Sequence, residues 1–150
     1  MVPALRLATA VDIPAIEQII KDAYTPYIAR IGRKPGPMLD DYAALVHARH
    51  VRVTTFDGDI QGILILIPQD DAMLLDNIAV APAAQGRGLG RRLLLAAEAL
   101  AREAAYRRIR LYTNEAMTEN IALYTRGGYV ETRRVEEKGL RRVYMEKDLA

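Results

Sequence analysis

The sequence predicts an α/β protein with a mixed, mostly antiparallel sheet, helices on both faces and one parallel pair of strands. Three observations lead there: strand-sized apolar runs alternate with helical stripes, hairpin turns join several strands, and one strand–helix–strand unit runs from Val80 to Ile109. A crossover of that kind joins parallel neighbours. The 150 residues, half of them hydrophobic, suit a single domain over 1–150 with its own core.

The N-terminal third is expected to hold a strand, a helix, a loop and a second helix. Leu5–Thr9 alternates as a strand does. Asp12 is a suitable N-cap for a helix whose apolar residues recur at helical spacing over Ile13–Ile20. Tyr24–Pro37 is rich in proline, glycine and tyrosine, which predicts a loop, and a short helix is expected over Met38–His47.

Three consecutive strands are expected next. Val51–Thr55 and Ile60–Ile67 flank Asp57-Gly58, a dipeptide that favours a tight hairpin turn. Ala72–Val80 is the third strand and leads into the glycine-rich turn. Antiparallel pairing is therefore expected across this part of the sheet.

The C-terminal part alternates helices and strands. Leu89–Arg102 has the apolar spacing of a buried-face helix, and Ile109–Thr113 reads as a strand. Thr118 is expected to cap a helix that runs to Arg126 and ends at Gly127-Gly128. The last segment, Val130–Lys147, is a hairpin that turns near Lys138-Gly139.

Composition excludes several classes of function. The absence of cysteine rules out disulfides, thiolate metal sites and a cysteine nucleophile. His47 and His50 have no evident third ligand, so no metal is expected. A net charge of +2 is too small to indicate nucleic acid, although seven arginines between 87 and 110 suit a compact anion. Without a signal peptide pattern or a membrane-length apolar run, we expect a cytoplasmic protein with no membrane partner.

The segment Gln85-Gly86-Arg87-Gly88-Leu89-Gly90 stands between a strand and a helix and holds three glycines. No lysine follows them, which excludes a Walker phosphate loop, and their spacing fits a dinucleotide fingerprint poorly. Two interpretations remain. The turn is merely tight, or its successive N–H groups at a helix N-terminus form an anion site that glycine lets a ligand approach closely.

At this point the chain resembles the GNAT superfamily of acetyl-coenzyme A-dependent N-acetyltransferases. The resemblance rests on "LLDNIAVAPAAQGRGLGRRLL", on "TNEAMTENIALYTRGGY" and on the order of the elements, and it covers nearly the whole chain. It implies a bulged strand that splays from its parallel neighbour and binds the pantetheine arm of acetyl-coenzyme A through the backbone of Ile78, Ala79 and Val80. It implies that the pyrophosphate binds to Gln85, Gly86, Arg87, Gly88, Leu89, Gly90 and Arg91.

The same resemblance implies one catalytic side chain and one further cofactor contact. Tyr124 matches the tyrosine that many members place near the sulfur as general acid, and Asn120, one helical turn earlier, would contact the cofactor arm. Asp76 is our candidate for drawing a proton from the amine or holding its ammonium form. Simple alternation puts Asp76 on the same sheet face as Val80, a parity that a bulge would break. Some relatives have a glutamate where this chain has Tyr112.

The acceptor is expected to lie against the segment after the first helix and against the final hairpin. Tyr27, Arg30, Asp41 and Tyr42 are the favoured contacts, and Tyr24, Arg33, Lys34 and Asp40 are further candidates. The resulting hypothesis is direct acetyl transfer to a primary amine in a ternary complex, with a small amine preferred over a peptide α-amine or lysine. A non-catalytic acyl-coenzyme A sensor is the alternative. A homodimer is expected by analogy.

Overall fold

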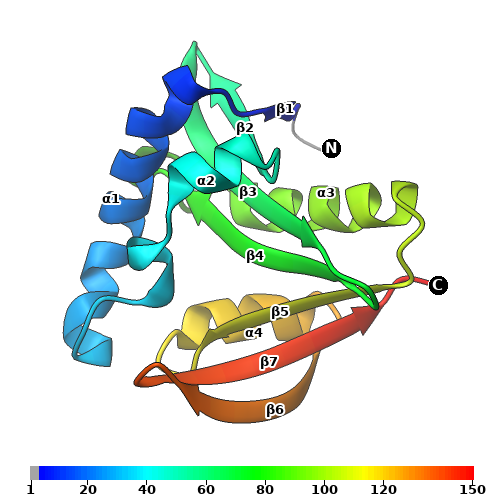
Figure 1. The fold of residues 1–150 in the computed structure, drawn as a ribbon. Helices are drawn as coiled ribbons and strands as arrows, with labels where there is room; N and C mark the ends of the chain where they lie inside the picture. The colour runs from blue at the N-terminus through cyan, green and yellow to red at the C-terminus, as the bar shows by residue number, and fades with distance from the viewer. Residues whose placement is uncertain (1–3) are drawn as a thin grey trace.

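A seven-stranded mixed sheet in the order β1-β2-β3-β4-β5-β7-β6 organises residues 4–150, the part of the chain that the computed structural model describes (Figure 1). The β4–β5 pair is parallel and the other neighbours are antiparallel, as the sequence predicts. The strands are β1 (Arg6–Leu7), β2 (Val51–Phe56), β3 (Asp59–Pro68), β4 (Met73–Val80), β5 (Arg108–Asn114), β6 (Val130–Glu137) and β7 (Leu140–Asp148).

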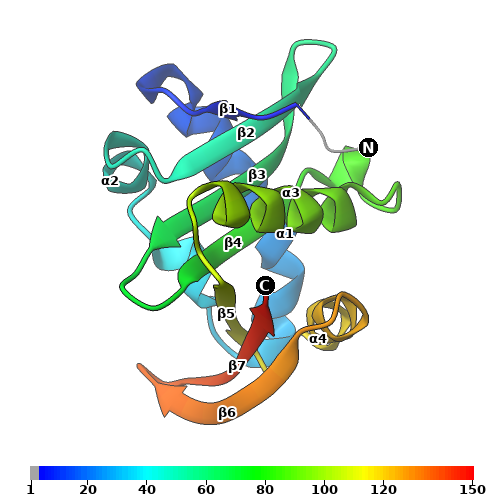
Figure 2. The ribbon, with the colours of Figure 1, turned by 90° about the vertical axis from the view of Figure 1, so that its right-hand side faces the viewer.

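Helices cover both faces of this sheet (Figures 1 and 2). They are α1 (Ile13–Ile31), α2 (Tyr42–His47), α3 (Leu89–Glu103) and α4 (Thr118–Arg126), with short 3-10 turns η1 (Ala10–Asp12), η2 (Gly36–Leu39) and η3 (Pro82–Ala84). The element order therefore agrees with the order expected from the sequence.

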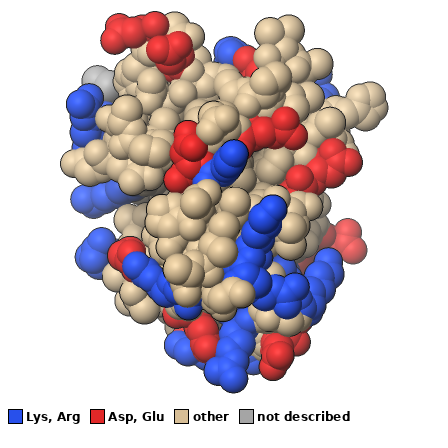
Figure 3. Space-filling model, turned by 90° about the vertical axis from the view of Figure 1, so that its left-hand side faces the viewer, with Lys and Arg blue, Asp and Glu red and all other residues tan. Residues whose placement is uncertain are grey.

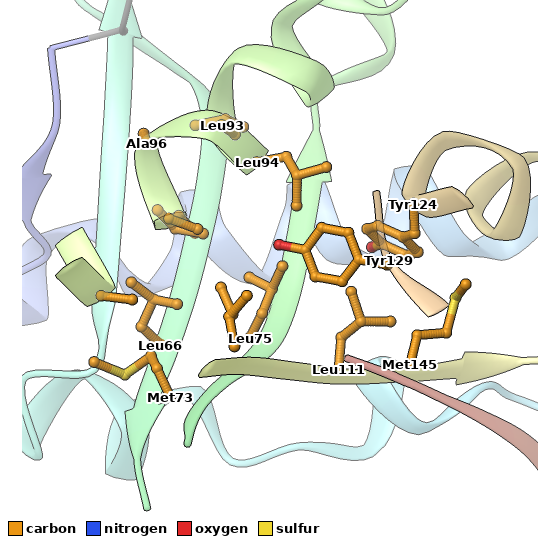
Figure 4. Packing of buried hydrophobic residues seen from close by; sticks show 14 of the residues in the cluster. Leu66, Met73, Leu75, Leu93, Leu94, Ala96, Leu111, Tyr124, Tyr129 and Met145 are labelled. Carbon is orange, nitrogen blue, oxygen red and sulfur yellow. The ribbon is translucent and has the colours of Figure 1, made fainter. Parts of the chain in front are cut away.

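The two-residue period of β3 divides the core into two clusters. Leu64 and Leu66 pack with α3 and α4, whereas Ile63 and Ile65 pack with α1 and α2. Figure 4 shows part of the first cluster, in which Leu94 of α3 lies above the strand residues and the rings of Tyr124 and Tyr129. Both faces of this strand are buried, which accounts for its nearly continuous apolar sequence.

The loop expected over Tyr24–Pro37 is wrong, because α1 continues to Ile31 through Pro26. Proline removes one helical hydrogen bond. The helix persists because its apolar stripe continues past that point: Tyr24 is buried, and Tyr27 and Ile31 pack against the same cluster as the earlier isoleucines. Gly32, at φ +90°, then ends the helix in the left-handed conformation.

Three other boundaries differ from expectation. The first strand shortens to two residues, and the helix expected over Met38–His47 divides into η2 and α2. Asp41 caps α2 by accepting a hydrogen bond from the Ala44 N–H at 3.0 Å. Thr118 is the first residue of α4 rather than its cap, because Met117 occupies the N-cap position. These shifts of a few residues leave the topology unchanged.

A bulge in β4 separates it from β5. Ile65 pairs with Asn77 and Leu66 pairs with Leu75, so Asp76 is the extra residue of β4. Parallel pairing with β5 covers only Met73–Leu75, and beyond it the two strands diverge. Val80 consequently packs toward α3. The shared face that alternation predicted for Asp76 and Val80 is therefore wrong.

Candidate functional site

Two cavities meet where β4 and β5 diverge. The larger, a cleft of about 1230 Å³, runs from the glycine turn between α3 and α4 to β4. The smaller, a pocket of about 290 Å³, lies between β4, β5, η2 and the β6–β7 hairpin. Five residues line both cavities, so they define a common junction: Tyr24, Ile78, Met117, Asn120 and Tyr124.

The glycine turn forms one end of the cleft. Gly86 and Gly88 have φ values of +80° and +77°, where a side chain would strain the backbone. Gly88 is the N-cap of α3, and the first bond of the helix runs from the Arg92 N–H to its carbonyl at 3.1 Å. The preceding N–H groups of the first turn have no helical acceptor and stand at the positive end of the helix dipole. This end of the cleft is therefore suited to an anion.

Gly90 is a glycine for which the folded chain gives no reason. It lies in the first turn of α3 without a positive φ. Outside its own turn of helix, no atom of the described residues would lie within 4 Å of a Cβ added there. Leu89, just before it, is buried and anchors the helix to the core. The open space beside Gly90 is where a close ligand would fit.

The polar residues around the turn have different roles. The Gln85 amide donates to the Val80 carbonyl at 3.1 Å and so ties the turn to the end of β4. Arg91 and Arg126 line the cleft, and neither has a carboxylate within 4.0 Å among residues 4–150. Arg87 is exposed and lies outside the lining. Two cations of the cleft wall are thus free to contact an anion.

The backbone of Ile78, Ala79 and Val80 forms the inner wall of the cleft. One edge of this segment pairs with β3, and the other faces the space left by the divergence of β5. Unpaired strand groups of this kind can bind an extended ligand as a further strand would. Tyr24 of α1 supports the segment, because its hydroxyl donates to the Asn77 side chain at 2.5 Å.

Tyr124 lies at the junction, with its ring 5.9 Å from the ring of Tyr129 (Figure 4). None of the described residues forms a hydrogen bond with its hydroxyl. Burial raises the pKa of Tyr124 to about 12, so the phenol keeps its proton at neutral pH. Asn120 lies one turn earlier on α4 and lines the same two cavities. This arrangement offers a proton donor to whatever occupies the junction.

Asp76 projects into the smaller pocket. Burial raises its pKa to about 6, with a further contribution from the charge of Asp40, while Tyr112 and Arg142 act in the opposite direction. The carboxylate is therefore mostly ionised at pH 7 but can accept a proton with little free-energy cost. It is the bulge that turns this side chain toward the pocket.

The four favoured acceptor contacts lie outside the smaller pocket. Tyr27 lines the cleft, and Arg30 forms an ion pair with Glu119 of α4 at 2.6 Å. Asp41 caps α2, and Tyr42 is buried with its hydroxyl donating to the Pro37 carbonyl at 2.5 Å. A direct role in binding the acceptor stays a prediction for all four.

Several pocket residues escaped the sequence reasoning or were only secondary candidates. Tyr112 is a departure from the family pattern, and Asp40 and Arg33 are secondary candidates. Arg142 lies in the final hairpin that the sequence assigns to the acceptor side, but it is not singled out there, because its place in the pocket depends on the register of β7 against β5. Tyr24 extends the spacing of Ile16 and Ile20, a signal that could have lengthened the predicted helix.

Within residues 4–150, no group of three or more His, Cys, Asp or Glu side chains is placed to hold a metal ion. No helix in the same part of the chain has the length and apolarity needed to cross a membrane.

Comparisons with known proteins agree on one family. Residues 13–129 match the sequence profile of the Acetyltransferase (GNAT) family. An uncharacterized N-acetyltransferase of Escherichia coli, YjgM, is 29% identical over 136 residues, which cover 85% of this chain and 81% of that protein.

Solved structures share the fold. The ribosomal-protein-alanine N-acetyltransferase of Brucella melitensis has a TM-score of 0.78 at 25% identity, covering 97% of this chain and 99% of its own. Salmonella typhimurium yncA, solved with its cofactor acetyl-CoA, has a TM-score of 0.75 at 21% identity, covering 100% of this chain and 95% of its own.

Proposed function

The chain belongs to the GNAT acetyltransferase family, and we propose that it transfers the acetyl group of acetyl-coenzyme A directly to a primary amine in a ternary complex. Membership of the family makes it an acyltransferase. The observation that carries the finer proposal is the junction itself. The cleft that begins at the glycine turn and the pocket that holds Asp76 open toward each other at Tyr124.

The cleft offers a matched partner for each part of acetyl-coenzyme A. The N–H groups of residues 86–91 and the side chains of Arg91 and Arg126 would contact its phosphates. The backbone of Ile78–Val80 would pair with the pantetheine arm, and Asn120 would contact the arm near the thioester. Gly90 supports this assignment, because the space beside it is empty of protein and a methyl group there would face the anion.

Two side chains at the junction suit the chemistry of transfer. An alkylammonium with a pKa of about 10.4 is nearly all protonated at pH 7, so the amine must lose a proton before its nitrogen attacks the thioester carbonyl carbon. Asp76 would hold the ammonium and take that proton. As the C–S bond breaks, Tyr124 would donate its proton to the leaving sulfur. The walls of the two cavities would supply the alignment that accelerates the attack.

A small amine remains our preferred acceptor over a peptide α-amine or lysine. The pocket volume of about 290 Å³ lies at the lower end of the range for ligand sites. The B. melitensis relative, by its name, modifies an alanine of a ribosomal protein, so a peptide amine is the natural competitor. A cytoplasmic location and a homodimer remain part of the proposal, and light scattering after size-exclusion chromatography tests the dimer.

Binding is tested by titrating acetyl-coenzyme A into the protein by calorimetry, beside the variant Gly88→Asp. Aspartate tolerates the left-handed conformation better than most residues, so the variant is expected to fold. Its carboxylate would repel the pyrophosphate. We expect micromolar binding that the variant loses. Equal affinity in both folded proteins would mean that the turn does not hold the phosphates.

Catalysis is tested by release of free thiol from acetyl-coenzyme A in the presence of amines. Tyr124→Phe is expected to slow transfer by about 10²-fold or more while keeping the affinity for acetyl-coenzyme A. Tyr106→Phe is the matched control, because the Tyr106 hydroxyl bonds the Gln69 carbonyl away from both cavities. Binding without transfer to any amine would favour the non-catalytic sensor.

A further inference from the structure

The smaller pocket contains two carboxylates that form no ion pair with residues 4–150. Asp40 comes from the segment after η2 and Asp76 from the bulge of β4. Burial raises the pKa of both, and the charge of Asp40 also raises that of Asp76, which means that the two acids lie close enough to repel each other. Asp76 is partly buried, and a buried carboxylate without a cation costs folding free energy, whereas Asp40 is exposed. One ligand ammonium between the two acids would relieve that cost and their mutual repulsion.

The same pocket contains a fixed cation. The Arg142 guanidinium lies 4.5 Å from the centre of the Tyr112 ring, and its Nη1 bonds Glu137 at 3.0 Å. Only 13% of the Arg142 side chain is exposed. Its Nε and Nη2 form no hydrogen bond with the described residues. A planar guanidinium that is fixed through Nη1 and has Nε and Nη2 without partners is suited to bind a carboxylate.

The position of Arg142 depends on Gly36. A Cβ added at Gly36 would lie 3.3 Å from Nη2 of Arg142, closer than an easy contact. The guanidinium lowers the pKa of Asp40 and of Asp76, so it lies within electrostatic range of both. It nevertheless forms no ion pair within 4.0 Å with either acid. The pocket therefore presents opposite charges that are near each other but separated, the complement of a zwitterion.

The mouth of the pocket adds positive charge. Arg33 and Lys138 both line it and are exposed. An added Cβ at Gly139 of the β6–β7 turn would overlap the Arg33 guanidinium, so this side chain lies directly against the turn. Lys and Arg are also frequent on the lower half of the face shown in Figure 3, at the level of β5, β6 and β7. The positive potential of these side chains would attract an acceptor that bears a carboxylate.

We propose that the acceptor is a small zwitterion of the amino-acid type, with its ammonium between Asp76 and Asp40 and its carboxylate on Arg142. The inference rests on the proposed function and narrows it to one class of substrate. It makes Arg142 a specificity-determining residue. An amine without a carboxylate would leave the Nε and Nη2 donors of Arg142 without a partner in the pocket, and an internal peptide residue would offer a neutral carbonyl there.

The test compares matched acceptors in the thiol-release assay: tyrosine with tyramine, histidine with histamine, serine with ethanolamine, and a short peptide with an N-terminal alanine. At least one amino acid is expected to exceed its decarboxylated partner at least tenfold in kcat/KM. Arg142→Gln should remove that advantage, chiefly through a higher KM for the amino acid, and Arg142→Lys should partly restore it. Arg141→Gln is the control, because that side chain is 72% exposed and pairs with Glu115 instead.

Each outcome decides the inference. Better transfer to the decarboxylated amines or to the peptide would overturn it, as would an equal loss for both partners in folded Arg142→Gln. If no acceptor releases thiol, the proposed function fails, and calorimetry of the same amino acids with the coenzyme A-saturated protein then decides the inference separately. Binding that Arg142→Gln abolishes would support the zwitterion site. Absence of binding would refute it.

Discussion

The variant Gly90→Ala distinguishes a merely tight glycine turn from one that holds an anion, because its effect on thermal stability should change sign when coenzyme A is bound. In the free protein the position is helical and has no positive φ, and an added Cβ would have no described atom within 4 Å outside its own turn of helix. Alanine there should therefore stabilise the fold by about 0.5 kcal/mol, the lower end of the usual gain because the site is in the first turn. In a domain of this size, that raises Tm by about 1–2 °C.

With coenzyme A bound, the variant should instead be less stable than wild type. The methyl group would push the pyrophosphate away from the first-turn N–H groups, and one weakened charged hydrogen bond costs about 1.5–3 kcal/mol, or at least tenfold in affinity. At a coenzyme A concentration of about 100 times the wild-type Kd, the ligand stabilises wild type by about 2.7 kcal/mol and such a variant by about 1.4 kcal/mol. The Tm of Gly90→Ala should therefore exceed that of wild type without ligand and fall below it with ligand.

Thermal unfolding with and without coenzyme A measures both quantities in one assay. Gly58→Ala is the control: its φ of +82° in the β2–β3 turn predicts a loss of about 1–2 kcal/mol with no change in the ligand-induced shift. An unchanged ligand-induced shift in Gly90→Ala would refute the reasoning, because the glycine would then have no role in close approach.

Three further perturbations test other parts of the structure. The pKa of about 6 for Asp76 predicts that kcat/KM rises as the pH increases through 6, and Asp76→Asn should abolish that inflection in the pH profile. The pKa of Asp76 in the folded protein lies above the unfolded value of 3.8, so the stability that Asp76 contributes is complete below pH 3.8 and is lost as the pH rises through 6. Asp76→Asn should therefore stabilise the free protein at pH 7 by up to about 3 kcal/mol. A variant that is less stable than wild type in urea unfolding would contradict this sign. Leu93→Ala removes a fully buried side chain under α3 and should cost about 2–5 kcal/mol in the same assay, whereas a loss below about 1 kcal/mol would mean that the core is not packed as described. Glu119→Gln breaks the exposed ion pair with Arg30 and should change stability by less than about 1 kcal/mol, so a larger loss would show that this contact between α1 and α4 holds the cleft together.

The sequence by itself determined the order of the elements, the crossover and the position of the glycine-rich turn. Each depends on local chemistry that a short window of residues records. The period of the apolar residues separates strand from helix, Asp57-Gly58 selects a hairpin, and Gly86 and Gly88 allow a left-handed backbone directly before a helix. The family motif around Tyr124 and Asn120 is local in the same sense, because both residues lie on one face of one helix.

Only the tertiary structure decided the make-up of the smaller pocket and the length of α1. The side chain of Asp76 faces the pocket because β3 and β4 change register at Ile65 and Leu66, and a register depends on both strands at once. Asp40 and Arg142 are about a hundred residues apart in the sequence, and both line the smaller pocket because the β6–β7 hairpin lies beside η2. No short window of sequence contains both residues. Pro26 remains helical because the packing of Tyr24 and Ile31 outweighs a local preference for a break.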